Sequence, residues 1–320
     1  MTIRLAPDHR LTPLFREHHV AWMSVEAAER QDFRPLYIGI LNIMPQAENY
    51  EFNLLAPMGR SILQIVPIWI RLMDHDYKSS DREHLERNYL PYDWVQSVAS
   101  LDGLIVTGAP VEELPWEQVT YWNELQRIFR VAKEAGTIML GICWGGLALA
   151  KFLGIEKIHY PKKVFGVYRT RNLAPDHPVM GGLDDVFWCP QSRHSGVDDA
   201  VLEAEAEAGR IRLLAYAEKG GYTIFETSDR QIMMHLGHQE YNSGRLLAEA
   251  RRDREKGRED VGPLENLDFD APVNVWRANR NEFFNAWIKH VYLTTPYEKE
   301  SGKPAAVNEL VVPPENGGKA

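Results

Sequence analysis

The stretch GTIMLGICWGGLALAKFLG, Gly136–Gly154, places a cysteine between an apolar run and a run of good helix formers. The first half reads as a short buried strand and the second half as the helix that follows it. A strand that turns sharply into a helix at Gly-x-Cys-x-Gly is typical of a nucleophile elbow. The thiol of Cys143 would then lie at a helix N-terminus, whose partial positive charge favours the thiolate. The alternative is a buried structural cysteine beside a tight turn.

Strand and helix patterns alternate on both sides of this stretch. Apolar runs predict strands at Leu36–Met44, around Pro67 at an edge or irregular position, and at Gly103–Thr107. An amphipathic helix is predicted over Trp116–Ala135, a hairpin that turns at 228–230, and a charged helix over Ser243–Lys256. This alternation predicts an α/β fold with a largely parallel sheet and ligands at the C-terminal strand ends, where Cys143 lies.

Composition limits the class of protein. The 320 residues are 44% hydrophobic and 25% charged, as in ordinary soluble proteins of one or two domains. Two cysteines, Cys143 and Cys189, do not form a disulfide framework, so we expect a reducing cytoplasm. The sequence contains neither an apolar leader nor a long apolar run, so neither secretion nor a membrane span is expected. A net charge of −9 argues against a general nucleic-acid binder.

His238 and Glu240, in LGHQEY, are the candidate base and its orienting group. Two residues apart on an extended segment, their side chains share a face. A carboxylate on one ring nitrogen would fix the tautomer and leave the other nitrogen facing the thiol. His194, in PQSRHSG, is the competing base. No metal site is expected, because the cysteines lack CxxC spacing and HExxH does not occur.

Further landmarks follow one another in order between Gln31 and Tyr297. They are RPLYIGILNIMP, DGLIVTGAPVEEL, YWNEL, ICWGG, KKVFGVY, SRH, GHQEY, RRDREKG and WRANRNEFFNAW. Together they resemble the homoserine O-acyltransferase (homoserine transsuccinylase) family of the class I glutamine amidotransferase-like superfamily. The resemblance implies a flavodoxin-like, doubly wound α/β fold with helices on both faces of the sheet. It also implies an N-terminal extension over 1–34 and an acyltransferase domain over 35–297, and the Pro/Gly-rich composition of the remaining residues predicts a loose tail over 298–320.

The resemblance implies an acyl-CoA-dependent O-acyltransferase of methionine biosynthesis with a ping-pong mechanism. Cys143 would carry the acyl group, and His238, oriented by Glu240, would act as the base in both half-reactions. The backbone N–H of Trp144 would bind the oxyanion. The acceptor amino acid would contact three further positions, namely Lys163, Ser192 and Arg252. An arginine fork suits the acceptor's α-carboxylate.

Glu112, in GAPVEEL, is the position at which the resemblance implies a choice of acyl donor. Glutamate there goes with acetyl-CoA and glycine with succinyl-CoA, because a glutamate would repel the carboxylate of a succinyl group. Acetyl transfer is therefore favoured over succinyl transfer. The expected partners are acetyl-CoA or succinyl-CoA, a small hydroxy amino acid and a second copy of the chain. No cofactor, metal, nucleic acid or membrane is expected.

Departures from the family pattern cluster around the expected pocket. The family writes Met-Pro-Thr-Lys-x-Glu-Thr-Glu where this chain has MPQAENYEF, so Ala47 replaces the family lysine. Further departures are Gly146-Leu147, QSRHSG and WRANRN. Serine therefore stays open as an acceptor beside homoserine, since one methylene changes affinity by only about 1–3 kcal/mol. A glutamine-hydrolysing amidotransferase and a catalytically inactive binding domain are the alternatives from other classes.

Overall fold

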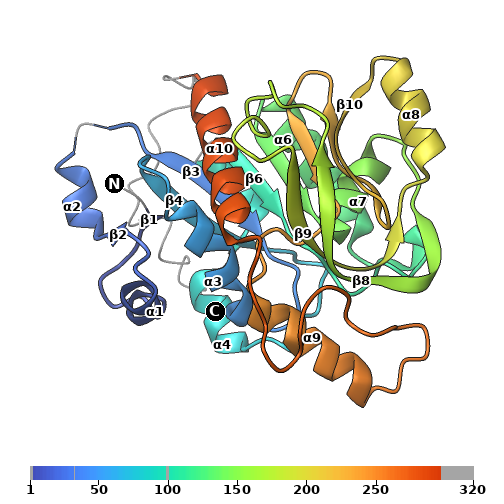
Figure 1. Cartoon of the computed structure of the whole chain (residues 1–320). Coiled ribbons are helices and arrows are strands. Elements are labelled where there is room, and N and C mark those ends of the chain that lie inside the picture. Colours follow the sequence, from blue (N-terminus) through green and yellow to red (C-terminus); the bar gives the residue numbers. More distant parts are fainter. Residues whose placement is uncertain (1–2, 32, 99–100, 297–320) are drawn as a thin grey trace, which may run out of the picture.

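A single mixed β-sheet forms the centre of the molecule in the computed structural model, which describes residues 3–31, 33–98 and 101–296 (Figure 1). Its strands run in the order β2-β1-β4-β3-β6-β7-β12-β11-β10-β8-β9, and β5 pairs with β4. The strands are β1 (Ile3–Arg4), β2 (Trp22–Met23), β3 (Leu36–Leu41), β4 (Ile65–Arg71), β5 (Leu90–Pro91), β6 (Gly103–Val106), β7 (Ile138–Ile142), β8 (Ile158–Asn172), β9 (Val186–Gly196), β10 (Ile211–Ala217), β11 (Gly221–Thr227) and β12 (Ile232–His235).

The direction of the strands changes at β12. From β2 through β12 the pairings are parallel, and from β12 to β9 they are antiparallel. The parallel strands β3, β6 and β7 are buried along their whole length, as expected for strands covered on both faces. The predicted parallel-sheet α/β class is therefore confirmed, and the antiparallel strands extend the sheet on one side.

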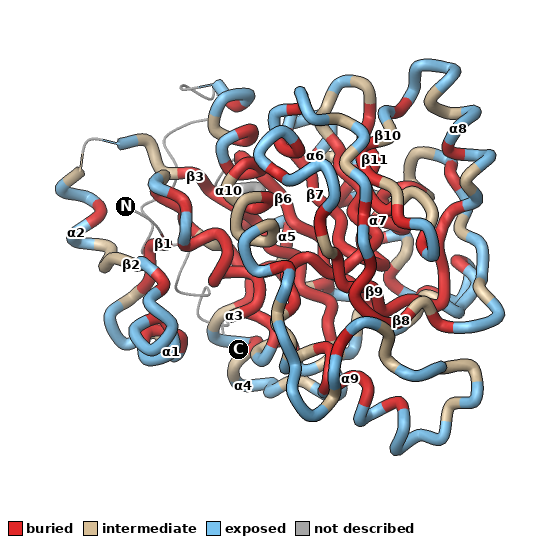
Figure 2. The backbone as a smooth tube through the Cα atoms, in the orientation of Figure 1, coloured by how far each residue is buried: buried red, intermediate tan, exposed pale blue. Residues whose placement is uncertain are grey.

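Helices cover both faces of the sheet. They are α1 (Thr12–Glu17), α2 (Val25–Glu29), α3 (Ala47–Met58), α4 (Arg82–Asn88), α5 (Tyr92–Val98), α6 (Trp122–Glu134), α7 (Trp144–Phe152), α8 (Asp199–Glu207), α9 (Ser243–Glu255) and α10 (Arg277–Thr294). Buried side chains of α3, α9 and α10 belong to one core, and those of α5 to α8 belong to the other. Figure 2 shows the buried chain running between these two layers. Both cores reach the carboxyl ends of the parallel strands, where Cys143 and Trp144 lie.

Two parts of the fold differ from the pattern in the sequence. The predicted helix over Trp116–Ala135 is wrong at its start, because a 3₁₀ turn occupies Trp116–Gln118 and α6 begins only at Trp122. The reason is packing, since the buried Trp116 ring lies 5.8 Å from the Trp144 ring and Val119 is extended. The sequence pattern also does not predict the long antiparallel strands β8 and β9.

The segment predicted as an N-terminal extension joins the sheet. β1 pairs with β4 at Ile65, and β5 pairs with β4 at Ile70. Pro67 lies between these two short pairings, which agrees with its predicted irregular position near an edge. The predicted tail over 298–320 lies outside the described residues. Within the part of the chain that is described, no helix has the length and apolar character to cross a bilayer.

Candidate active site

Cys143 lies at the sharp turn between β7 and α7. It is the N-cap of α7 with φ 52° and ψ −115°, a conformation that costs an L-residue free energy. The turn is held by close packing, because a Cβ at Gly145 would lie 2.2 Å from the carbonyl oxygen of Val106. A Cβ at Gly141 would lie 2.5 Å from the carbonyl oxygen of Gly145. The predicted elbow is therefore confirmed as a backbone feature.

His238 and Glu240 lie just beyond the end of β12, beside this turn. Nδ1 of His238 is 2.7 Å from Oε1 of Glu240, and both side chains are buried. The other side of the imidazole hydrogen-bonds to the Cys143 thiol. Burial disfavours a charged imidazole, but the negative charges of Cys143 and Glu240 outweigh it and raise the pKa of His238 well above its ordinary value. The structure thus brings the three predicted catalytic side chains into one chain of contacts.

Gly108, just after β6, lies close to both Cys143 and His238. A Cβ placed there would lie 3.6 Å from Cβ of Cys143, 3.7 Å from Cε1 of His238 and 3.3 Å from Sδ of Met44. Met44 also lines a cavity of about 180 Å³ between the loops that follow β3, β4 and β6. As the first residue of α7, Trp144 has a backbone N–H without an intrahelical acceptor. Met44, Gly108 and Trp144 follow the parallel strands β3, β6 and β7, so they lie at the C-terminal strand ends, where the sequence predicts ligands.

A second group of polar side chains lies behind the imidazole. The Tyr241 ring stacks on the His238 ring, with centroids 4.0 Å apart and an interplanar angle of 20°. Glu249 of α9 accepts hydrogen bonds from the Tyr241 hydroxyl at 2.7 Å and from Oγ of Ser192 at 2.5 Å. Ser192 is therefore linked to His238 through two intervening side chains, Glu249 and Tyr241.

Lys163 and Arg252, the other two predicted acceptor contacts, meet at one carboxylate. Nζ of Lys163 is 2.6 Å from Oδ2 of Asp253, and both side chains are buried. Nη2 of Arg252 is 3.0 Å from Oδ1 of the same residue, with 44% of the Arg252 side chain exposed. Asp253 also lines a cavity of about 330 Å³ between α9 and the loop that follows it. Lys163 and Arg252 thus form one charged cluster.

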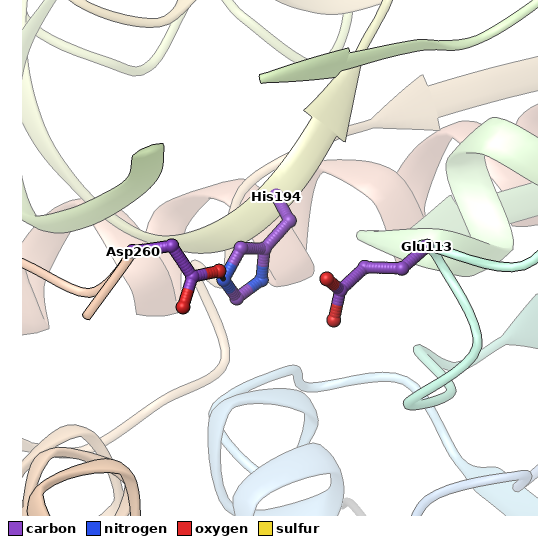
Figure 3. Close-up of side chains that lie close together, drawn as sticks. All are labelled: Glu113, His194 and Asp260. Carbon is purple, nitrogen blue, oxygen red and sulfur yellow. Dashed lines mark ion pairs between the residues drawn. The ribbon is translucent and has the colours of Figure 1, made fainter. Parts of the chain in front are cut away.

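Glu112 and His194 lie in a separate charged cluster. Nδ1 of His194 is 3.2 Å from Oε1 of Glu112, and Nε2 of His194 is 3.0 Å from Oδ2 of Asp260. Figure 3 shows His194 between Asp260 and Glu113, and the nearest ligand atoms of these three residues lie within 4.8 Å of one another. This is the kind of group that can bind a metal ion.

Arg258 already supplies a positive charge to that cluster. Its guanidinium donates two hydrogen bonds of 2.9 Å to the carboxylate of Glu113, and others to Asp260. These hydrogen bonds lower the pKa of Glu113 and lower that of Asp260 further. The carboxylates are therefore paired within the protein.

Cys189 differs from Cys143 in its surroundings. It lies in β9, fully buried, and burial raises the pKa of its thiol well above the ordinary value. Its thiol hydrogen-bonds to the Pro190 carbonyl and the Gln191 side chain. It has the features of a structural cysteine.

The sequence does not predict several side chains that complete the site. Tyr50 of α3 donates a hydrogen bond to Glu240. Glu249 accepts a hydrogen bond from Tyr241 and pairs with Arg245. Asp253 pairs with Lys163. A signal for two of them is present in α9, where Glu249 and Asp253 are four residues apart on the face that carries the buried Leu246 and Ala250. A carboxylate on the apolar face of a helix needs a buried partner.

The family model described as homoserine O-succinyltransferase matches residues 2–297. The homoserine O-acetyltransferase of Petrotoga mobilis is 36% identical over 94% of this chain and 98% of its own. That of a Geobacillus species is 36% identical over 94% of this chain and 100% of its own.

Solved structures with a similar fold are much more distant in sequence. A glutamine amidotransferase from Methylobacillus flagellatus superposes with a TM-score of 0.52 at 13% identity, covering 85% of this chain and 99% of its own. A glutamine amidotransferase from Thermotoga maritima gives 0.50 at 12% identity, covering 80% and 97%. At this identity the likeness concerns the fold alone, and it confirms the predicted amidotransferase-like class.

Proposed function

Because this chain belongs to the homoserine O-succinyltransferase family and is a homoserine O-acyltransferase of methionine biosynthesis, we propose that it transfers an acetyl group from acetyl-CoA to the hydroxyl of L-homoserine. The transfer passes through an acyl-cysteine and takes place in the cytoplasm. One observation carries the proposal: a cysteine at a strained elbow hydrogen-bonds to an imidazole whose far nitrogen is 2.7 Å from a buried carboxylate. This is the arrangement of an activated nucleophile.

In the first half-reaction the thiolate of Cys143 attacks the carbonyl carbon of the thioester. The carbonyl π electrons move onto oxygen, and the backbone N–H of Trp144 at the start of α7 stabilises this oxyanion. The intermediate collapses with cleavage of the carbon–sulfur bond to CoA. The imidazolium of His238 gives its proton to the leaving thiolate, so CoA departs as the thiol and His238 becomes neutral.

In the second half-reaction neutral His238 accepts the proton of the homoserine hydroxyl. The alkoxide oxygen attacks the acyl-cysteine, and the carbon–sulfur bond breaks to return the thiolate. Acylation itself prepares the base for this step. It removes the negative charge of Cys143, which is one of the causes that raise the pKa of His238, so the proton affinity of the ring falls in the acyl-enzyme.

Acetyl is the proposed acyl group because of Glu112. Its side chain is only 14% exposed, and Oε1 is 3.2 Å from Nδ1 of His194. Oε2 is buried, and no hydrogen-bond partner for it lies among residues 3–31, 33–98 and 101–296. A succinyl carboxylate beside this oxygen would be repelled by it. The curated relatives at 36% identity, both named homoserine O-acetyltransferase, support the same donor.

Arg252 is the proposed contact of the homoserine α-carboxylate. Its guanidinium is partly exposed and shares Asp253 with Lys163, so it retains hydrogen-bond donors for a ligand. Arg252→Ala should raise the KM for homoserine sharply and leave acylation of Cys143 nearly unchanged. Arg254→Ala is the matched control in α9, because that guanidinium lies 4.4 Å from the Phe269 ring. Equal losses in both half-reactions would assign Arg252 to the fold or to the donor.

The decisive experiment combines acetyl-CoA and succinyl-CoA with homoserine, serine and glutamine. We expect CoA release with acetyl-CoA and homoserine, and one added acetyl mass on Cys143 when acetyl-CoA is given alone. Cys143→Ala should lose both, whereas Cys189→Ala should keep both. Acetyl mass on Cys189, or glutamine hydrolysis without acyl transfer, would contradict the proposal.

The choice of donor has its own test. Glu112→Gly should gain activity with succinyl-CoA, because both the space and the charge of the carboxylate are removed. Glu113→Gly is the control, since that neighbouring carboxylate binds Arg258 instead. Wild-type protein that prefers succinyl-CoA would overturn the assignment of acetyl.

A further inference from the structure

Tyr50 is a buried tyrosine near the start of α3 whose hydroxyl reaches the catalytic carboxylate. Its side chain is 0% exposed, and its hydroxyl donates a hydrogen bond to Oε1 of Glu240. The two residues are 190 positions apart in the chain. α3 follows β3 directly, so the first turns of this helix lie at the same strand ends as the elbow.

Two donors share one oxygen of Glu240. Nδ1 of His238 is 2.7 Å from Oε1, and the Tyr50 hydroxyl donates to the same atom. Oε2 is buried, and it has no hydrogen-bond partner within the described part of the chain. The orientation of the carboxylate, and hence of the imidazole, therefore depends on these two hydrogen bonds. Losing one of them leaves a buried charge that is only partly satisfied.

The ring of Tyr50 also packs against a neighbour of the imidazole. It meets the Tyr241 ring edge to face, with centroids 6.1 Å apart and an interplanar angle of 81°. The Tyr241 ring in turn stacks on His238 at 4.0 Å. The guanidinium of Arg245 lies 5.8 Å from the centroid of each tyrosine ring. Tyr50 thus contacts Glu240 and Tyr241, two of the side chains that lie against His238.

We infer that Tyr50 is a positioning residue of this active site, which holds Glu240 so that His238 stays aligned with Cys143 in both half-reactions. The inference rests on the proposed function, because it assigns Tyr50 a role in acyl transfer through the same histidine. Tyr50 contributes a hydrogen bond that neither the elbow nor the His-x-Glu motif contains.

The other groups around Glu240 do not duplicate this contact. The titratable and charged groups that act on it come from α3, β9, β12, α10 and the segment after β12, namely Tyr50, Cys189, His235, Arg280, His238 and Tyr241. Burial lowers the pKa of His235 to about 4 and raises that of Cys189, so both are neutral near pH 7. Arg280 brings positive charge from α10, and its Nε donates to Asn281.

The test compares Tyr50→Phe with Tyr89→Phe. Tyr89 is an equally buried tyrosine whose hydroxyl also binds a carboxylate, at 3.0 Å from Glu51, and it does not contact Glu240. Tyr50→Phe should lower kcat about tenfold and leave the KM for homoserine within about twofold, because one hydrogen bond to a charged group is lost and the binding groups are intact. Tyr89→Phe should keep the wild-type kcat.

The pH dependence of acyl transfer separates positioning from a purely structural role. Without the Tyr50 hydroxyl, the charge of Glu240 acts more fully on the imidazolium, so the acid limb of kcat should move to higher pH in Tyr50→Phe. Difluorotyrosine at position 50, a stronger donor of the same shape, should move that limb to lower pH. It also keeps the test valid if Tyr50→Phe does not fold.

Different results would contradict the role of Tyr50 and the proposed function. Unchanged kcat and an unchanged acid limb in Tyr50→Phe, with wild type still forming acetyl-Cys143, would overturn the role of Tyr50 alone. A loss of activity that follows thermal stability equally in Tyr50→Phe and Tyr89→Phe would also overturn it. Absence of acetyl-Cys143 in wild type would instead contradict the proposed function.

Discussion

His238 and His194 both lie against carboxylates, and they differ in what occupies the other side of each ring. His238 has Glu240 at Nδ1 and the Cys143 thiol on its far side. His194 has Glu112 at Nδ1. Its Nε2 faces Asp260, at 3.0 Å (Figure 3), and also Nη2 of Arg258, at 3.2 Å. One ring therefore faces a nucleophile, and the other faces an ion pair.

The two regions also differ in how far their charged side chains are exposed to solvent. Glu240 is fully buried, whereas the side chains of Asp260 and Arg258 are 33% and 31% exposed. Charge interactions are strong in the first region and screened in the second. A histidine beside a carboxylate has the surroundings expected of a catalytic base only where a nucleophile lies on its other side, which is why the pattern His-x-Glu predicts little by itself.

Replacing the two histidines should give the largest difference in acyl transfer between the two regions. His238→Asn should lower acyl transfer by about 10²–10⁴-fold, because the base for both half-reactions is removed. His194→Asn should cost no more than severalfold, since its ring binds Glu112 and not the thiol. The measurement is the single-turnover rate of CoA release followed by transfer to homoserine. A larger loss for His194→Asn would reverse the assignment of the base.

Replacing the carboxylates should give the next largest effect. Glu240→Gln should lower kcat by about 10²-fold, because an amide cannot hold the imidazole in the required tautomer or stabilise its charge. Asp260→Asn should leave kcat within about twofold, as its partner is Arg258. Steady-state kinetics on both variants, with circular dichroism as a check on folding, decides between them. A wild-type rate in Glu240→Gln would leave Glu240 with a structural role only.

Removing Arg258 should have a small effect on stability that depends on pH. Hydrogen bonds from Arg258 lower the pKa of both Glu113 and Asp260, so this stabilisation is complete above their ordinary pKa values and is lost as pH falls. Arg258→Ala should therefore lower Tm by about 1–2 °C at pH 7. The difference from wild type should begin to shrink as pH falls below about 4, and it should disappear only when pH falls through the lowered pKa values of both carboxyls. A difference that grows on acidification would show that other groups hold this cluster.

Removal of divalent cations should have the smallest effect. The guanidinium of Arg258 already pairs the carboxylates of Glu113 and Asp260, so these ligand atoms have little affinity left for a cation. Dialysis against a chelator, and addition of zinc or magnesium afterwards, should change neither Tm nor activity. A Tm that rises with added zinc would show that the cluster binds metal in spite of Arg258.

The sequence predicts the parts of the site that are local in the chain. The elbow is contained in Gly-x-Cys-x-Gly, and His238 and Glu240 are two residues apart, so short-range geometry suffices for each. The Tyr50 hydrogen bond and the Ser192–Glu249 contact span 190 and 57 residues, and no local pattern encodes them. Sequence motifs therefore identify the proposed reacting groups and miss the residues that contact them.

The same limit applies to the fold. β3, β6 and β7 are continuous apolar runs that the sequence predicts well, because both faces of each strand are buried. β8 has no such run, and its pairing with β9 shifts register between His159 and Val164. At Gly166, with φ 151°, a Cβ would lie 2.4 Å from the carbonyl oxygen of Glu265. That strand depends on a partner segment about a hundred residues further along.

The last described helix has a consequence for how the protein is made. Trp276, just before α10, is fully buried and donates a hydrogen bond of 2.7 Å from Nε1 to the carbonyl oxygen of Tyr241. The ring of Phe283 in α10 also lies 5.2 Å from that of His235. On the ribosome, the elbow emerges more than a hundred residues before these contacts can form. A nascent chain would therefore carry Cys143 before the segment that packs against Tyr241 and His235 has been synthesised, and we expect acyl transfer to begin only after α10 has docked.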